Sequence, residues 1–330
     1  MSDSTHYAPP GPLGFGGAPL GNMFERVTDA EAVSTLDAAW DAGIRYFDTA
    51  PEYGPGISEH RFGQVLRGKP RDEFVLSTKV GRLLRADASK GGRHGPFVAG
   101  LPFRVDYDYS ADGVRRSIED SLQRLGLARI DVAYIHDCAE DAHGDAWLEV
   151  FDTAMKGAAV ALTKLREEGV IRGWGLGVNR VEPCVMALER SDPDVFLLAG
   201  RYSLLNQPAL DELFPRCAER GVHVVVGGPY NSGLIAGGKT FEYQQASPEQ
   251  VAARDRLAAI ADKYRVDLRA AALQFCAAHP VVASVIPGTK SPQRLIQNVV
   301  LMGQAIPAAF WEELKSEHVL PENAPTPAGR

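Results

Sequence analysis

Short apolar segments alternate with segments of helical periodicity along this chain, and no other feature restricts its fold as strongly. Strands connected by helices form parallel sheets that are buried on both faces. An open doubly wound sheet would give the same local pattern, but the number of strand candidates favours an α/β fold of the (β/α)8 TIM barrel type. The eight candidates are residues 13–17, 44–49, 74–78, 130–135, 171–178, 195–199, 222–226 and 281–286.

The barrel is predicted to be a single domain of residues 13–319. Residues 1–12 and 320–330 are rich in proline and small residues, and we expect them to be loose tails. Two internal segments, 82–109 and 235–248, do not fit the repeat and are expected to be loops. Both follow the carboxyl end of a strand, where barrel enzymes build their sites, so they are candidates for lids or substrate walls. A solvated insertion is the alternative.

The composition is that of an ordinary soluble globular protein. The net charge of −7 gives no reason to attract nucleic acid. No apolar stretch reaches the roughly 18 residues of a membrane span, and the first twelve residues do not resemble a signal peptide. The four cysteines form no CxxC pair, so neither a disulfide framework nor a zinc site is indicated. We expect a cytoplasmic protein without membrane or nucleic-acid partners, and a homodimer because twofold assemblies are the commonest.

Four chemically active side chains lie at or just beyond the carboxyl ends of neighbouring predicted strands: Asp48, Tyr53, Lys79 and His136. Each alone has an ordinary structural explanation, but together they form a coherent acid–base group. A tyrosine pKa of about 10 is too high for easy proton exchange near neutrality, and an ammonium beside the phenol oxygen would lower it. Asp48 would hold Lys79 charged, and His136 would orient a substrate oxygen. Such a group suits proton transfer at an alcohol or carbonyl carbon, whereas hydride transfer requires a cofactor.

The segment IPGTKSPQRLIQN (286–298) predicts an anion-binding site. It runs from the last strand into a helix that Ser291 can cap. Free backbone N–H groups, together with Thr289, Lys290 and Arg294, suit a phosphate at the helix N-terminus, although an ordinary capped helix is the alternative.

Two other signals fail. GFGGAPLG (14–21) lacks the GxGxxG spacing of a dinucleotide-binding loop. HDC (136–138) with His143 matches no spacing of metal ligands, so we predict no metal site.

Several segments together resemble the aldo-keto reductase family, in order and over almost the whole chain. They are FDTAPEYG (47–54), STK (77–79), YIHD (134–137), GWGLGVN (173–179) and IPGTKSPQRLIQN (286–298). GGPYNSGLIAGG (227–238) and FLLAGRYSLLNQ (196–207) are especially similar to a branch of bacterial sugar dehydrogenases typified by L-fucose and D-threo-aldose 1-dehydrogenase. The resemblance implies a (β/α)8 barrel that binds NAD(P) in an extended pose without a Rossmann domain.

The resemblance also implies roles for individual residues. Tyr53 would be the proton donor or acceptor, supported by Asp48 and Lys79, with His136 orienting the substrate. The cofactor contacts would be a nicotinamide-binding residue after the fifth strand, a loop over the pyrophosphate and the segment that binds the adenosine phosphate. In chain order these are Asn179, Ser232, Leu234, Gly288, Thr289, Lys290, Arg294 and Asn298.

Some positions depart from the family pattern. Asn179 falls one place late, and Ala199 stands where a glutamine is common. Gly227-Gly228 replace the aromatic residue that stacks on the nicotinamide. Gly288 aligns with a family lysine that often binds the 2′-phosphate of NADP, although Lys290 and Arg294 could replace it. NAD and NADP both stay open as cofactors, and we favour NAD.

We predict an NAD(P)-dependent dehydrogenase that oxidises an L-fucose-like aldose at C1 to a lactone, with ionised Tyr53 taking the hydroxyl proton. A dehydrogenase of another small alcohol or of a pyridoxal-type hemiacetal is the first alternative. An NAD(P)-binding sensor or auxiliary subunit with negligible turnover is the alternative from another class. A metal-dependent barrel hydrolase would lack ligands.

Overall fold

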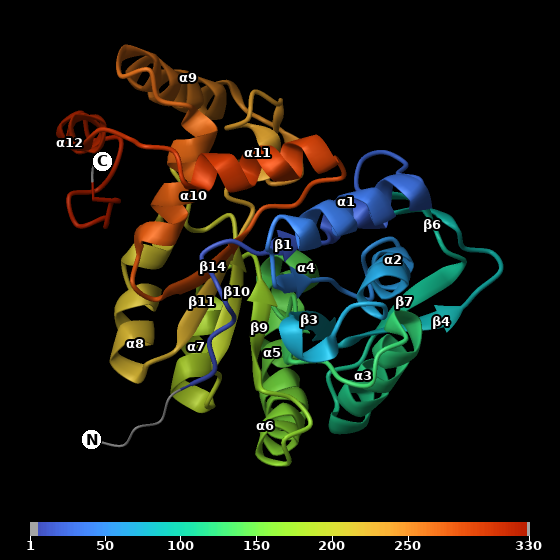
Figure 1. Ribbon diagram of the computed structural model, residues 1–330. Helices are drawn as coiled ribbons and strands as arrows, with labels where there is room; N and C mark the ends of the chain where they lie inside the picture. Colours follow the sequence, from blue (N-terminus) through green and yellow to red (C-terminus); the bar gives the residue numbers. More distant parts are fainter. Residues whose placement is uncertain (1–5, 329–330) are drawn as a thin grey trace.

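Eight parallel strands lie at the centre of the computed structural model, which describes residues 6–328 (Figure 1). Bridges from Leu13 to Val285 and from Gly16 to Gly288 join the first strand to the last, so the sheet is a nearly closed barrel. The predicted barrel is therefore confirmed. In spatial order the strands are β1 (Phe15–Gly16), β2 (Tyr46–Asp48), β3 (Val75–Val80), β8 (Val132–His136), β9 (Gly173–Val178), β10 (Val195–Ala199), β11 (His223–Gly227) and β14 (Val282–Ile286).

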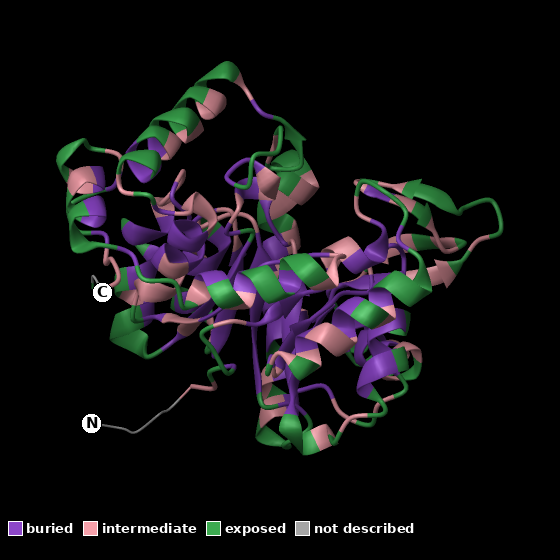
Figure 2. Ribbon diagram, turned by 45° about the horizontal axis from the view of Figure 1, so that its top comes forward, coloured by how far each residue is buried: buried purple, intermediate pink, exposed green. Residues whose placement is uncertain are grey.

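Helices surround the barrel, with buried residues toward the strands and exposed residues outward (Figure 2). The predicted capping box is present at the start of the first helix, where Glu31 N donates to Thr28 Oγ1 at 3.2 Å and Thr28 N donates to Glu31 Oε2 at 2.8 Å. The helices are α1 (Asp29–Asp41), α2 (Ile57–Leu66), α3 (Ala111–Leu125), α4 (Glu140–His143), α5 (Trp147–Ala154), α6 (Val160–Glu167), α7 (Glu182–Arg190), α8 (Leu213–Arg220), α9 (Pro248–Lys263), α10 (Leu268–Ala278), α11 (Pro292–Met302) and α12 (Ala308–Ser316).

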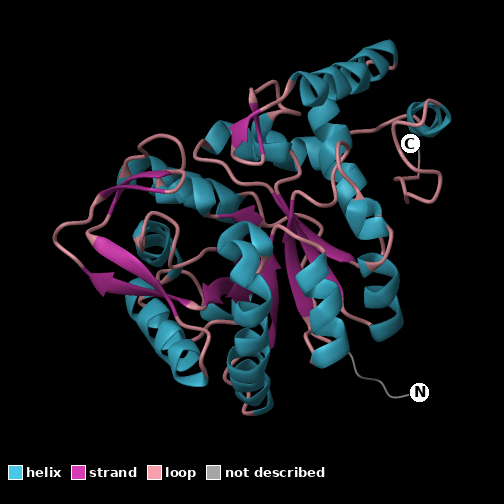
Figure 3. Ribbon diagram, turned by 180° about the vertical axis from the view of Figure 1, so that it is seen from behind, coloured by secondary structure: helices cyan, strands magenta, loops and turns pink. Residues whose placement is uncertain are grey.

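The segments expected to be loops contain antiparallel hairpins, so that expectation was wrong. In 82–109, β4 (Arg82–Ala86) pairs with β7 (Phe103–Tyr107), and β5 (Gly92–His94) pairs with β6 (Phe97–Gly100). In 235–248, β12 (Thr240–Phe241) pairs with β13 (Gln244–Gln245). The β4–β7 pair projects from one side of the barrel (Figure 3). Their strands are short, most of their residues are half-buried or exposed, and several are charged, so no clear period-2 pattern is seen in the sequence.

Alternate strand residues face the helices and the barrel interior. The interior cluster contains Tyr46 and Tyr134, both fully buried. Their hydroxyls lie 3.0 Å apart, and the Tyr46 hydroxyl lies 3.1 Å from Ser77 Oγ. Ser77 Oγ in turn donates to Asp48 Oδ1 at 2.6 Å. A chain of hydroxyl groups therefore reaches from mid-barrel to the carboxyl end of β2.

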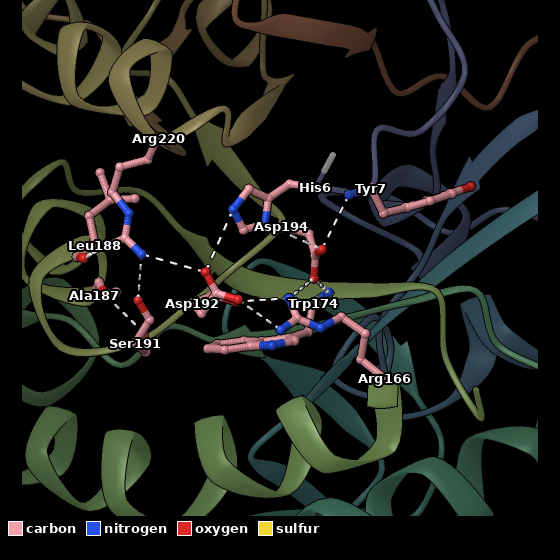
Figure 4. A network of polar contacts seen from close by, with 10 residues as sticks. All are labelled: His6, Tyr7, Arg166, Trp174, Ala187, Leu188, Ser191, Asp192, Asp194 and Arg220. Atoms are coloured by element: carbon pink, nitrogen blue, oxygen red, sulfur yellow. Dashed lines mark hydrogen bonds and ion pairs between the residues drawn. The ribbon is translucent and has the colours of Figure 1, made fainter. Parts of the chain in front are cut away.

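The first described residues, His6 and Tyr7, join a polar network around Asp194, which directly precedes β10 (Figure 4). Tyr7 N donates to Asp194 Oδ1 at 3.2 Å, and the ring of Tyr7 packs against the interior cluster. Near the other terminus, Leu320 and Ala324 are buried. The domain limits at 13 and 319 stay a prediction, but the described parts of both terminal stretches hold contacts with the barrel.

Candidate active site

Strands β2 and β3 end side by side and bring Asp48 and Lys79 together at the carboxyl end of the barrel. Lys79 Nζ donates to Asp48 Oδ2 at 2.8 Å and to the Thr49 carbonyl at 2.9 Å. Both side chains of the pair are almost fully buried. Burial raises the pKa of Asp48, although Lys79 and the hydrogen bonds oppose that shift. The pair fixes the ammonium at the floor of the site.

Tyr53 lies over this floor, and the predicted group of four is brought together. Lys79 Nζ lies 4.7 Å from the centroid of the Tyr53 ring, and the His136 ring meets the Tyr53 ring edge-on at 6.1 Å between centroids. Burial and the neighbouring Asp48 raise the pKa of Tyr53 well above its ordinary value, which is opposite to the expected direction. Burial of the phenol is the largest cause, and the Lys79 ammonium faces the ring and donates its hydrogen bonds to Asp48 and a backbone carbonyl.

His136 ends β8 and is a neutral imidazole near neutral pH. Burial, reinforced by Arg82 and Lys79, lowers the pKa of His136 well below its ordinary value. Its Nδ1 has no hydrogen-bond partner within residues 6–328. A neutral ring with a free nitrogen can give or take one hydrogen bond at a substrate oxygen.

Sequence reasoning missed an ionic cluster beside His136. The guanidinium of Arg82, on β4, pairs with Glu52 and, at 2.6 Å, with Asp137. Asp137 Oδ2 lies 3.5 Å from His136 Nε2. Burial raises the pKa of Asp137 to about 7, although Arg82 lowers it. The signal was present, because both acids adjoin a predicted catalytic residue in the sequence.

The spacing of Glu52, His136 and Asp137 resembles that of metal ligands, since one ligand atom of each lies within 4.8 Å of the others. However, the Arg82 guanidinium already supplies a positive charge to both carboxylates. These residues therefore do not fit a metal ion.

A cavity of about 610 Å³ begins at Asp48 and Tyr53 and extends to the start of α11. Most of the predicted cofactor contacts line it: Ser232, Gly288, Thr289, Lys290, Arg294 and Asn298. As predicted, Ser291 caps α11 and accepts from Arg294 N.

Two predicted cofactor contacts lie outside the lining of this cavity. The Asn179 amide donates to Asp141 Oδ2 at 3.0 Å and so is directed at α4. Leu234 is fully buried, and its carbonyl accepts from Arg254 on α9.

The lining fits a long, negatively charged dinucleotide. Its floor includes glycines, and a Cβ at Gly288 would stand 2.7 Å from Pro19 Cδ, too close for any other residue without a shift. Arg269, Lys290 and Arg294 gather at the end far from Tyr53, where cationic side chains suit phosphates. The opposite end holds Asp48 and Tyr53, with Lys79 and His136 beside the Tyr53 ring, so a nicotinamide would lie next to these residues.

The chain belongs to the aldo/keto reductase family, whose model matches residues 12–317. It is therefore an oxidoreductase acting on CH–OH groups, and this family uses NAD(P).

Two similar relatives are dehydrogenases. The chain is 44% identical to pyridoxal 4-dehydrogenase from Microbacterium luteolum, over 93% of this chain and 94% of that one. It is 41% identical to D-threo-aldose 1-dehydrogenase from a Pseudomonas species, over 94% of each. Among solved structures, the holo form of aldo-keto reductase AKR11C1 from Bacillus halodurans matches with a TM-score of 0.69 and 27% identity, covering 99% of this chain and 98% of that one. The predicted family and branch are confirmed.

No helix in the described part of the chain is long and apolar enough to cross a membrane. The homodimer and the cytoplasmic location stay predictions.

Proposed function

We propose that the protein is an NAD-dependent dehydrogenase that oxidises the C1 hemiacetal of an L-fucose-like aldose to the lactone. In this reaction C1 loses a hydride and its hydroxyl loses a proton, and bound NAD supplies the hydride acceptor. The observation that carries the proposal is the placement of Tyr53, which contacts Lys79 and His136, at one end of a cavity that is also lined by Arg269, Lys290 and Arg294.

Tyr53, the Asp48–Lys79 pair and His136 have different roles in the transfer of the substrate hydroxyl proton. Tyr53 accepts the proton of the substrate hydroxyl, and the Asp48–Lys79 pair fixes a positive charge beneath its ring. Neutral His136 holds the hydroxyl by a hydrogen bond. Because the pKa of Tyr53 lies above its ordinary value, the phenol is the main form at pH 7 and the oxidation rate rises with pH.

Two observations bear on the substrate. The charged Glu52–Arg82–Asp137 cluster lies next to His136, and such polar surroundings favour an aldose. The centroid of the buried Phe97 ring lies 5.6 Å from that of the Tyr53 ring, and this aromatic neighbour favours a flat ring. A pyridoxal-type hemiacetal is therefore the second candidate.

The choice of NAD rests on the far end of the cavity. Lys290, a candidate partner for a 2′-phosphate, is already paired with Glu25. A second anion beside this carboxylate would be repelled. NAD, which lacks the 2′-phosphate, avoids that repulsion.

The test is a panel of aldoses and pyridoxal with NAD and NADP, followed by the absorbance of the reduced cofactor. We expect turnover of L-fucose or pyridoxal, and a loss of at least about 100-fold in Tyr53→Phe with NAD binding retained. Cofactor binding without turnover of any substrate would instead favour a sensor or auxiliary subunit.

A further inference from the structure

The β12–β13 hairpin is strained at its tip. Thr240 pairs with Gln245 and Phe241 with Gln244, which leaves Glu242 and Tyr243 as the two turn residues. Their φ angles are 45° and 65°. A two-residue turn with both φ values positive favours Asn-Gly, and larger side chains are strained there. Strained residues of this kind persist where their surroundings hold them, often at ligand clamps.

Contacts with the barrel hold this tip in place. The Glu242 carboxylate pairs with Arg201, a nearly buried residue just after β10. Arg201 Nε donates to the Asn179 carbonyl after β9 at 2.7 Å. Tyr243 N donates to Ser232 Oγ, on the cavity wall, at 3.1 Å. The tip is therefore tied to the ends of two barrel strands and to the predicted cofactor loop.

Tyr243 faces the reacting end of the cavity. It lines the same cavity as Tyr53, together with Gly227 and Gly228, which leave that wall without a side chain. The side chain as a whole is 45% exposed. Burial of its hydroxyl, with Tyr53 and Asp137 adding to the effect, raises the pKa of Tyr243. Tyr243 is therefore partly open to solvent and partly a lining residue of the cavity that Tyr53 also lines.

We propose that Tyr243 is an aromatic wall of the substrate site, held there by the Arg201–Glu242 ion pair. The inference rests on the proposed function and narrows its substrates to cyclic hemiacetals, pyranose or pyridoxal, whose ring packs against the Tyr243 face. Tyr243 then determines specificity, and the hairpin supplies the aromatic surface that β11 lacks at Gly227-Gly228. Glu242 and Arg201 are positioning residues that act through Tyr243.

The test measures substrate binding separately from turnover. In a Tyr53→Phe background, which silences the proposed chemistry, isothermal titration of L-fucose and of pyridoxal into the NAD-saturated protein gives Kd with and without Tyr243→Ala. We expect Tyr243→Ala to raise the Kd of the ring substrate about tenfold and Tyr243→Phe to raise it less than about threefold. Glu242→Gln is expected to fall between the two. Glu189→Gln, which removes the exposed Arg216–Glu189 pair, is the matched control and is expected to change nothing.

The outcomes are distinct. An unchanged substrate Kd in Tyr243→Ala overturns the inference. A higher Kd for NAD with an unaltered substrate Kd also overturns it, because the Tyr243 ring would then cover the cofactor and not the substrate. If Tyr243→Ala fails to fold by circular dichroism, Tyr243→Leu replaces it under the same criteria. Absence of turnover in the wild-type enzyme refutes the proposed function, whereas the binding result still decides the role of Tyr243.

Discussion

Replacing Lys79 by methionine isolates the energetic role of the buried ion pair at the floor of the site. The Nζ–Oδ2 distance is 2.8 Å, and at an effective dielectric constant of about 20 the attraction is about 6 kcal/mol before desolvation is counted. Burial already raises the pKa of Asp48 despite Lys79, so desolvation offsets much of that attraction. Without the ammonium, Asp48 would keep the Ser77 hydrogen bond but lose its counter-charge.

We expect Lys79→Met to lower the free energy of unfolding by about 3–5 kcal/mol at pH 7. Urea unfolding followed by tryptophan fluorescence measures this loss, with Glu189→Gln as an exposed-pair control that should cost less than about 1 kcal/mol. The double variant Asp48→Asn/Lys79→Met should recover most of the loss, because no charge is then left buried.

The pH dependence has a definite sign. Removing the ammonium raises the folded-state pKa of Asp48 further above its unfolded value. A group with a raised folded-state pKa stabilises fully below its unfolded pKa, and this contribution is lost as the pH rises through the folded value. The cost of Lys79→Met should therefore shrink as the pH falls from 7 toward 4. A cost below about 1 kcal/mol at pH 7, or one that does not change with pH, would refute this reasoning.

Three further predictions test other parts of the site. In Gly177→Ala the new Cβ would stand 3.2 Å from Tyr134 Cβ and 3.4 Å from Lys79 Cε. Because this leaves Lys79 no spare room, we expect kcat to fall about tenfold in steady-state assays while circular dichroism is unchanged. An unaltered kcat would show that the neighbours of Gly177 adjust without moving the ammonium. Glu25→Gln removes the carboxylate paired with Lys290. Fluorescence titration should then show the affinity for NADP improved about fivefold relative to that for NAD. An unchanged ratio of the two Kd values would mean that Glu25 does not repel the 2′-phosphate. Burial lowers the pKa of His279 to about 4, so the stability contributed by the neutral ring is present above the unfolded pKa of about 6.5 and is lost as the pH falls. His279→Gln should therefore flatten the pH dependence of the free energy of unfolding in urea between about pH 6.5 and 4. An equal slope in the variant would show that His279 does not cause this dependence.

The barrel and its acid–base group could be predicted because both depend on local order in the sequence. Each strand is a continuous apolar run, and parallel strands place their last residues at one end of a barrel. Asp48, Lys79 and His136 therefore follow from strand ends alone.

The rest of the site depends on how distant segments meet. Arg82 reaches Glu52 and Asp137 because the β4–β7 hairpin leaves the barrel at a particular angle, which no periodicity encodes. Tyr243 reaches the cavity through a turn that its own residue type disfavours. The direction of the Tyr53 pKa shift was mispredicted because the burial of the phenol and its nearness to Asp48 and Asp137 are tertiary properties.

The hydroxyl chain from Tyr134 through Tyr46 and Ser77 to Asp48 has a consequence for protein engineering. Grafting new loops onto the rim leaves this internal scaffold untouched, so altered substrate preference is compatible with intact chemistry. Replacing the polar residues of the barrel interior by aliphatic ones, an ordinary route to thermostability, would remove the hydrogen bond that Ser77 donates to Asp48. The hydroxyl chain lies inside the barrel and the loops lie at its rim, so substitutions at the two places are expected to change different properties of the protein.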